Sequence, residues 1–257
     1  MLWNAIRWGG YNPTKEYFDM FPMADGSDFD WNNPEHTKNP FVNRDPRLNE
    51  TFLMDGDIFQ GRTAGLTAPK TDDKENYPAG RDWEIGAMNK LSLKTGIACR
   101  KWGLDRGAEL KGHVIQWPFL RIAELYLTYA EALNEAEGPV DDVYKYVDAI
   151  RKRAGLPGLA KGLDKDKMRE RIQHERQIEL AFEAGHRYFD CHRWKIAEKT
   201  DNGYMHGMNI TATNKVDYSK RSTVGDSRVF EKKHYLFPIP QSEMDKRIGL
   251  VQSPYWE

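Results

Sequence analysis

The stretch HERQIELAFEAGHRYFDCHRWKIAE, from His174 to Glu198, decides the fold. It predicts two helices joined at Gly185, because apolar residues recur at helical spacing on both sides of the glycine. The apolar residues expected in the core are Ile178, Leu180, Ala181 and Phe182 in the first helix and Tyr188, Phe189, Trp194 and Ile196 in the second. The two helices are expected to pack as a pair.

The first helix carries a row of acids, Glu175, Glu179 and Glu183, spaced four residues apart on one face. Like charges in such a row destabilise an isolated helix by some tenths of a kcal/mol per pair, so basic partners are expected. We expect these partners to be Arg171 and Arg176 in the same helix, and Arg187 and Arg193 beyond the glycine. The predicted structural ion-pair network comprises Arg121, Glu124, Glu175, Arg176, Glu179, Glu183, Arg187, Asp190 and Arg193.

Three segments in order resemble the SusD/RagB family. They are residues 169–194, RERIQHERQIELAFEAGHRYFDCHRW; residues 44–48, RDPRL; and residues 236–243, LFPIPQSE. One local departure is Ala184, which stands where the family has a tighter Glu-Gly joint.

The resemblance implies a surface glycan-binding lipoprotein that caps a SusC-like TonB-dependent transporter on the extracellular face of the outer membrane. It implies no enzymatic activity and no cofactor, with poly- or oligosaccharide and the transporter as partners. Family members are roughly twice as long and begin with a signal and a lipid-modified cysteine. The chain therefore resembles the C-terminal half of the family, as a fragment or a gene model that starts late, without the N-terminal half, the signal or the lipid anchor.

The fold class expected is all-α dominated, with tetratricopeptide-like helix pairs in an α superhelix, a large loop-rich segment and a few short strands. Residues 1–257 form one region with three parts: a loop-rich ligand-side segment (1–116), helix pairs (117–198), and an excursion followed by a Pro-rich end (199–257). One helix is expected from Trp117 to about Glu137, with Pro118 in its first turn and Phe119 on its apolar face. Asp141 or Asp142 should cap the next helix, which runs to Ala154 before Gly155 and Pro157.

In the loop-rich segment, a short helix is expected after Thr14, and two short strands around Ile85–Leu93 and Gly96–Trp102. Arg44, Asp45 and Arg47 are expected to tie their loop to the helices. Near the C-terminus, a hairpin-like excursion is expected in residues 199–233, and Ser242 can cap a final turn.

Aromatic residues of the loop-rich segment lack helical neighbours and are candidate sugar platforms, because a ring can stack on the apolar face of a sugar. The carbohydrate-binding candidates are Trp3, Trp8, Tyr11, Trp31, Tyr77, Trp83 and Asp82. Asn4, Asp28 and Asn32 are polar neighbours of these rings. A calcium loop at residues 25–30 is an alternative, although its spacing departs from the EF-hand pattern.

Composition limits the other functions. The net charge is −1, which gives no basis for nucleic-acid binding. The only cysteines, Cys99 and Cys191, offer no disulfide framework or metal motif. Glu183-x-x-His186 matches half of a di-iron pair, but Gly185 interrupts it, so no metal site and no catalytic residues are predicted. The alternative function is a helical-repeat adaptor that binds protein and no sugar.

Overall fold

The computed structural model describes residues 12–59, 61–67, 75, 95–101, 118–183, 185–209 and 217–256. They divide into two compact units. The first contains the described residues of Met1–Ala184 and His206–Val224, and the second those of Gly185–Met205 and Gly225–Glu257. Most of the regular structure is helical and the strands are few and short, which confirms the predicted fold class.

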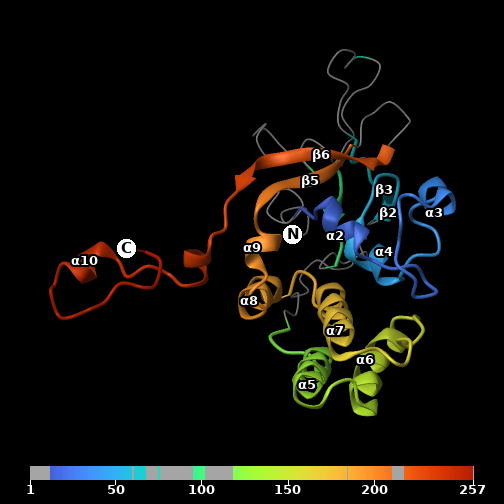
Figure 1. Cartoon of the computed structure of the whole chain (residues 1–257). Helices are drawn as coiled ribbons and strands as arrows, with labels where there is room; N and C mark the ends of the chain where they lie inside the picture. The colour runs from blue at the N-terminus through green and yellow to red at the C-terminus, as the bar shows by residue number, and fades with distance from the viewer. Residues whose placement is uncertain are drawn as a thin grey trace. The chain divides into compact units, whose positions relative to one another are not determined.

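Three helices of the first unit pack together: α5 (Ile122–Glu137), α6 (Asp141–Arg153) and α7 (Lys165–Glu179) (Figure 1). Their shared core is made of side chains from all three helices, namely Ala130, Val143, Tyr144, Val147, Met168 and Ile172. Helix α6 ends where predicted, because Gly155 takes a left-handed φ of +86° and Pro157 follows. Its N-cap is Val140, so Asp141 and Asp142 occupy the first turn and neither caps the helix.

Helix α5 begins at Ile122, five residues later than Trp117, which lies outside the described residues. Arg121 has an extended backbone (φ −124°, ψ 153°), and its guanidinium reaches acids of the segment after α7. These contacts keep the residues before Ile122 out of the helix. Pro118 is compatible with a first helical turn, but it does not by itself make the helix begin there. Phe119 is consequently 89% exposed and does not join an apolar helix face.

Helix α7 is buried on two sides. Ile172 belongs to the three-helix core, and Ile178 belongs to a second core built mainly by the loop-rich segment. The helix ends at Glu179, because Phe182 takes a left-handed φ of +57° and directs its ring to Tyr17, 5.7 Å away. Helix α7 packs with α5 and α6 in the first unit, and the following helix α8 (His186–Arg193) belongs to the second unit, so the pairing expected across Gly185 stays a prediction.

The loop-rich segment surrounds the second core. Its elements are α2 (Lys15–Asp19), α3 (Pro34–Lys38), α4 (Arg47–Thr51), β1 (Phe52–Leu53), β2 (Ile58–Phe59), β3 (Arg62–Thr63) and β4 (Ala98–Cys99). Thr14, expected near the start of this helix, caps α2, its Oγ1 accepting from the Tyr17 amide. Strand β4 lies within the predicted Gly96–Trp102 strand and pairs antiparallel with β1, whereas the strand predicted around Ile85–Leu93 lies outside the described residues.

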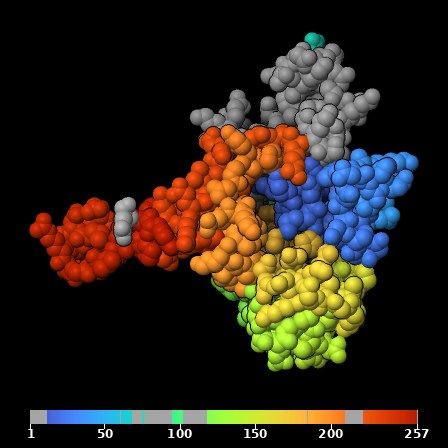
Figure 2. Space-filling view, in the orientation of Figure 1, coloured from blue at the N-terminus to red at the C-terminus, as the bar shows by residue number. Residues whose placement is uncertain are grey.

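Phenylalanine rings fill this second core. Phe18, Phe21 and Phe52 are fully buried, with centroid separations of 5.1 to 5.7 Å. Figure 2 shows the blue surface of this segment meeting the yellow surface of α6 and α7, all within the first unit. The loop-rich segment thus has a packed interior of its own.

Few of the described apolar side chains of the second unit are buried. Its elements are α8, α9 (Ala197–Thr200), η2 (Lys232–Tyr235) and α10 (Gln241–Met244). Tyr188 and Phe189, expected in the core, are 46% and 62% exposed, because α8 buries Asp190 and Cys191 on its inner side. Pro240, not Ser242, occupies the cap position of α10.

Strands β5 (Gly203–Asn209) and β6 (Asp217–Arg228) form a two-stranded sheet in the predicted excursion. Each strand runs from one unit into the other.

We expect the Phe52→Ala substitution to lower the free energy of unfolding by about 3–5 kcal/mol, because it leaves a cavity beside the buried rings of Phe18 and Phe21. The Phe119→Ala control removes a ring that is 89% exposed and should change stability by less than about 0.5 kcal/mol. Urea unfolding of both variants measures the difference. Equal losses would contradict the assignment of Phe52 to the core.

Candidate functional site

Trp31 is the one sugar-platform candidate that lies within the described residues. Its Nε1 donates to Asp19 Oδ1 at 2.9 Å, and the Phe29 ring meets it edge-on at 4.8 Å. The Lys15 ammonium lies 3.9 Å from the Trp31 ring centroid and 2.8 Å from Asp19 Oδ1. Burial lowers the pKa of Lys15, although its bond to Asp19 opposes that shift. Trp31 is therefore a half-buried anchor with one face already covered by a cation.

The loop that carries Trp31 is held from beneath by Arg44. This guanidinium is buried and donates to the carbonyl oxygens of Phe18, Phe21 and Pro40 at 2.7 to 3.2 Å. It also lies 3.8 Å from the centroid of the Phe29 ring. Burial without a directly bonded carboxylate lowers the pKa of Arg44 to about 10. Arg44 thus makes this loop a fixed surface.

A groove of about 560 Å³ opens between this loop and the outer face of α7. Its polar groups are largely engaged with one another. Arg171 donates to Asp28 at 2.9 Å, and Asp19 is bonded to Lys15 and Trp31. His174 Nε2 donates to the Met20 carbonyl at 2.7 Å, and burial lowers the pKa of its imidazole. The groove can accept a ligand, but few of its donors and acceptors are free.

Of the three acids expected on one helix face, Glu175 and Glu179 lie in α7, whereas Glu183 lies beyond the end of the helix. Together they are a strongly buried set of charges in the described first unit. Glu175, Glu179 and Glu183 are at most 4% exposed, yet each is bonded to cations from other segments. The partners are Arg47 and Arg151 for Glu175, Arg47, Arg121 and Arg153 for Glu179, and Lys101 and Arg121 for Glu183.

Of the predicted network, Arg121 binds Glu179 and Glu183. Arg171 binds Asp28, and Arg193 binds Asp190 three residues away in α8. Arg176 donates to Thr128 and lies 3.9 Å from Glu124, while Arg187 is exposed on α8. Arg171 stands one turn before Glu175 and could pair with it, but its guanidinium binds Asp28, and Glu175 is bound by Arg47 and Arg151 from other elements.

The sequence did not indicate four further members of this network, which are Arg47, Lys101, Arg151 and Arg153. Arg47 was expected only to tie its loop to the helices, which it does by binding both Glu175 and Glu179. For Arg151 and Arg153 the available signal was a cluster of basic residues in the last turn of α6.

The remaining sugar candidates, Trp3, Trp8, Tyr11, Tyr77, Asp82 and Trp83, lie outside the described residues, as does Asn4. Asp28 is bound to Arg171, and Asn32 donates to Asp30 within its own turn.

Neither a metal cluster nor a membrane-spanning helix is found where the chain is described. No group of three or more His, Cys, Asp or Glu side chains there could hold a metal ion. Asp25, in the calcium alternative, instead accepts from the backbone and hydroxyl of Ser27. Glu183, of the Glu-x-x-His pattern, is bonded to Lys101 and Arg121. None of the described helices is long and apolar enough to cross a bilayer.

Comparisons with known proteins agree with the motifs. The model of the SusD family matches residues 3–256. SusD-like protein P25 of Formosa agariphila is 42% identical over 159 residues, which are 58% of this chain and 29% of that protein. The crystal structure of a SusD-like carbohydrate-binding protein from Bacteroides fragilis superposes with a TM-score of 0.71 at 28% identity. A second SusD-like protein from the same organism gives 0.69 at 28% identity.

The matches differ in how much of each protein they cover. The alignments to the two solved structures take in 93% and 97% of this chain but only 48% and 47% of theirs. The chain thus spans about half the length of these structures and less than a third of the curated relative.

We expect Glu179→Gln to lower the free energy of unfolding by about 3–5 kcal/mol, because three arginines would lose a buried counter-charge. Glu135→Gln is the matched control, since the Glu135–Arg169 pair is exposed and should contribute at most about 1 kcal/mol. Chemical unfolding of both variants tests this. Similar small losses would show that the buried row contributes little to stability.

His174 should make stability depend on pH. Its pKa is lowered in the folded protein, so the unfolded chain binds a proton more readily. The free energy of unfolding should therefore fall as pH drops below the ordinary histidine value of 6.5. In His174→Gln, which keeps a donor for the Met20 carbonyl, this part of the pH dependence should disappear. Melting curves of both proteins between about pH 7 and 5 measure the difference, and parallel curves would contradict it.

Proposed function

This chain belongs to the SusD family, and from that premise we propose that it is part of a surface glycan-binding protein of a polysaccharide or oligosaccharide uptake system. The match across residues 3–256 carries the proposal. The relative described as carbohydrate-binding supports the ligand class. In this proposal the protein lies on the outer membrane and covers a SusC-like TonB-dependent transporter.

We assign the sugar contacts to the loop-rich segment before residue 104. The described part of that segment supports this assignment, because Arg44 and the phenylalanine core hold it as a fixed surface. A fixed surface loses less conformational entropy when it binds a ligand. A sugar stacked on one tryptophan contributes about 1–2.5 kcal/mol, so several platforms must act together for micromolar affinity, about 8 kcal/mol.

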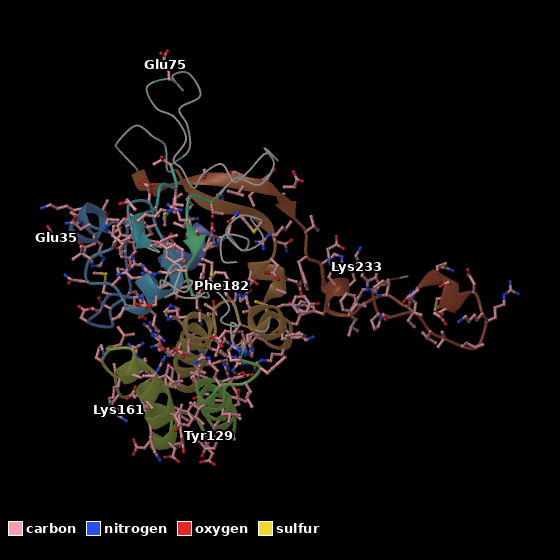
Figure 3. All side chains as sticks on the ribbon, turned by 180° about the vertical axis from the view of Figure 1, so that it is seen from behind. Glu35, Glu75, Tyr129, Lys161, Phe182 and Lys233 are labelled. Carbon is pink, nitrogen blue, oxygen red and sulfur yellow. The ribbon has the colours of Figure 1, made fainter. Side chains whose placement is uncertain are left out.

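A protein-binding function without sugar is the second candidate. It is favoured by exposed apolar residues at the start of α5, where Ile122, Leu125 and Tyr129 are 46% to 63% exposed. Figure 3 shows Tyr129 at the outer end of the three-helix group. Such a surface suits a protein partner, and in the proposed function that partner is the transporter.

The proposal predicts that single alanine substitutions at Trp8 or Trp83 weaken glycan binding by about 1–3 kcal/mol with little loss of stability. Glu179→Gln should do the opposite, lowering stability while the folded fraction binds with unchanged affinity. An array of purified polysaccharides identifies the glycan, and calorimetric titration beside melting curves separates the effects.

Two results would contradict the proposal. If no glycan on the array binds while a protein partner is retained, the chain is an adaptor. If Glu179→Gln abolishes binding in a fully folded protein and both tryptophan variants bind normally, the sugar contacts lie on the helices.

A further inference from the structure

A second pocket, of about 460 Å³, lies in the loop-rich segment. Its walls come from the turn at residues 23–25, from α3 and from residues 39–43. Its volume falls within the range of about 300–1,000 Å³ that is usual for small-molecule sites. Figure 3 shows Glu35, one of the lining residues, at the outer edge of the protein. The pocket is therefore open to a ligand from solvent.

The backbone around this pocket is fixed by short hydrogen bonds. The Ala24 amide donates to the Asn43 carbonyl at 2.7 Å, and the Met23 amide donates to the Ser27 carbonyl at 2.8 Å. Met23 also forms a β-bridge with Arg44, the arginine buried beneath the loop. The lining groups are thus positioned before any ligand arrives, which lowers the entropic cost of binding.

Several polar side chains of the pocket have no partner among the described residues. No hydrogen bond or ion pair there engages the side-chain amides of Asn39 and Asn43 or the carboxylate of Glu35. His36 Nδ1 accepts from the Asp30 amide, so in neutral His36 the proton is on Nε2, which is left as a donor. This distinguishes the pocket from the groove at α7, whose charged groups bind one another.

The lining groups are complementary to the two kinds of surface on a sugar ring, its polar hydroxyl groups and its apolar C–H face. The amides and Nε2 can donate to hydroxyl oxygens, and the carboxylates of Asp25 and Glu35 are strong acceptors for hydroxyl protons. Met23 and Val42 supply an apolar wall, and Val42 is 55% exposed. The lining includes two carboxylates and no lysine or arginine, so it disfavours an acidic sugar.

We propose that this pocket, lined by Met23, Asp25, Glu35, His36, Asn39 and Asn43, is a subsite for one neutral pyranose unit of the glycan. The inference rests on the proposed glycan-binding function and adds to it a place and a sugar class. Asn39 and Asn43 would hold adjacent hydroxyl groups, and Glu35 would close the rim.

The test uses isotope-labelled protein and four methyl glycosides, those of glucose, galactose, mannose and xylose, titrated to high millimolar concentration. At least one should shift the side-chain amide resonances of Asn39 and Asn43. Its dissociation constant should rise about tenfold, equal to 1.4 kcal/mol, in Asn39→Ala and in Asn43→Gly. Glycine suits position 43, because Asn43 has a φ of +55° that alanine would adopt only with strain. Methyl glucuronide should bind more weakly than methyl glucoside, from which it differs by one carboxylate.

Lys38→Ala is the matched control, since Lys38 is exposed on α3 and does not line the pocket. It should leave the titration unchanged. The inference is overturned if no glycoside shifts the two amides, if both asparagine variants bind as the parent does, or if the glucuronide binds more tightly. Binding of the array polysaccharide by the same variants separates the two proposals. If the polysaccharide binds but no glycoside binds the pocket, only the subsite is contradicted. If the parent protein binds no polysaccharide, the proposed glycan-binding function is contradicted.

Discussion

The structure of the first unit depends on one constraint, the pairing of three buried carboxylates, two on one face of α7 and the third just beyond its C-terminal end. Removing an ionised carboxylate from water is costly unless cations and hydrogen bonds replace the solvent. Glu175, Glu179 and Glu183 meet this requirement with cations from four places: α4, the end of β4, the segment before α5, and α6. Each of these segments must therefore lie against α7 for the charges to be satisfied, which makes α7 the organising helix.

This constraint acts on the loop-rich segment as much as on the helices. Arg47 connects the start of α4 to Glu175 and Glu179, and Lys101, two residues after β4, binds Glu183. A segment with few strands and short helices obtains in this way the rigidity that it does not get from secondary structure. The aromatic core around Phe18 and Phe52 then fills the space between these fixed points. A surface of this kind can keep polar groups in place without a sheet beneath them.

The sequence predicted well what depends on local spacing. The end of α6 before Gly155, the short helix after Thr14 and the placing of Glu175 and Glu179 on one helix face follow from residues within one or two turns. Arg121 was expected in the network of the acids, but Arg47, Lys101, Arg151 and Arg153 were not, because they are 24 to 132 residues away and periodicity carries no information at that range. The start of α5 was misjudged for the same reason, since Arg121 is held in an extended conformation by distant glutamates. At the site, the sequence around Trp31 did not indicate that Lys15 covers one face of the ring.

The same reasoning distinguishes surface that supports the fold from surface available to a ligand. A charged group bonded to another charged group has already replaced its water, so a sugar hydroxyl gains little by approaching it. The groove beside α7 is of this kind, with Arg171 bonded to Asp28 and His174 bonded to Met20. An amide that stands free on a fixed backbone still holds water, which a hydroxyl can displace with an equivalent bond. Free polar groups on rigid backbone therefore indicate ligand-binding surface better than the number of charges or the size of the hollow.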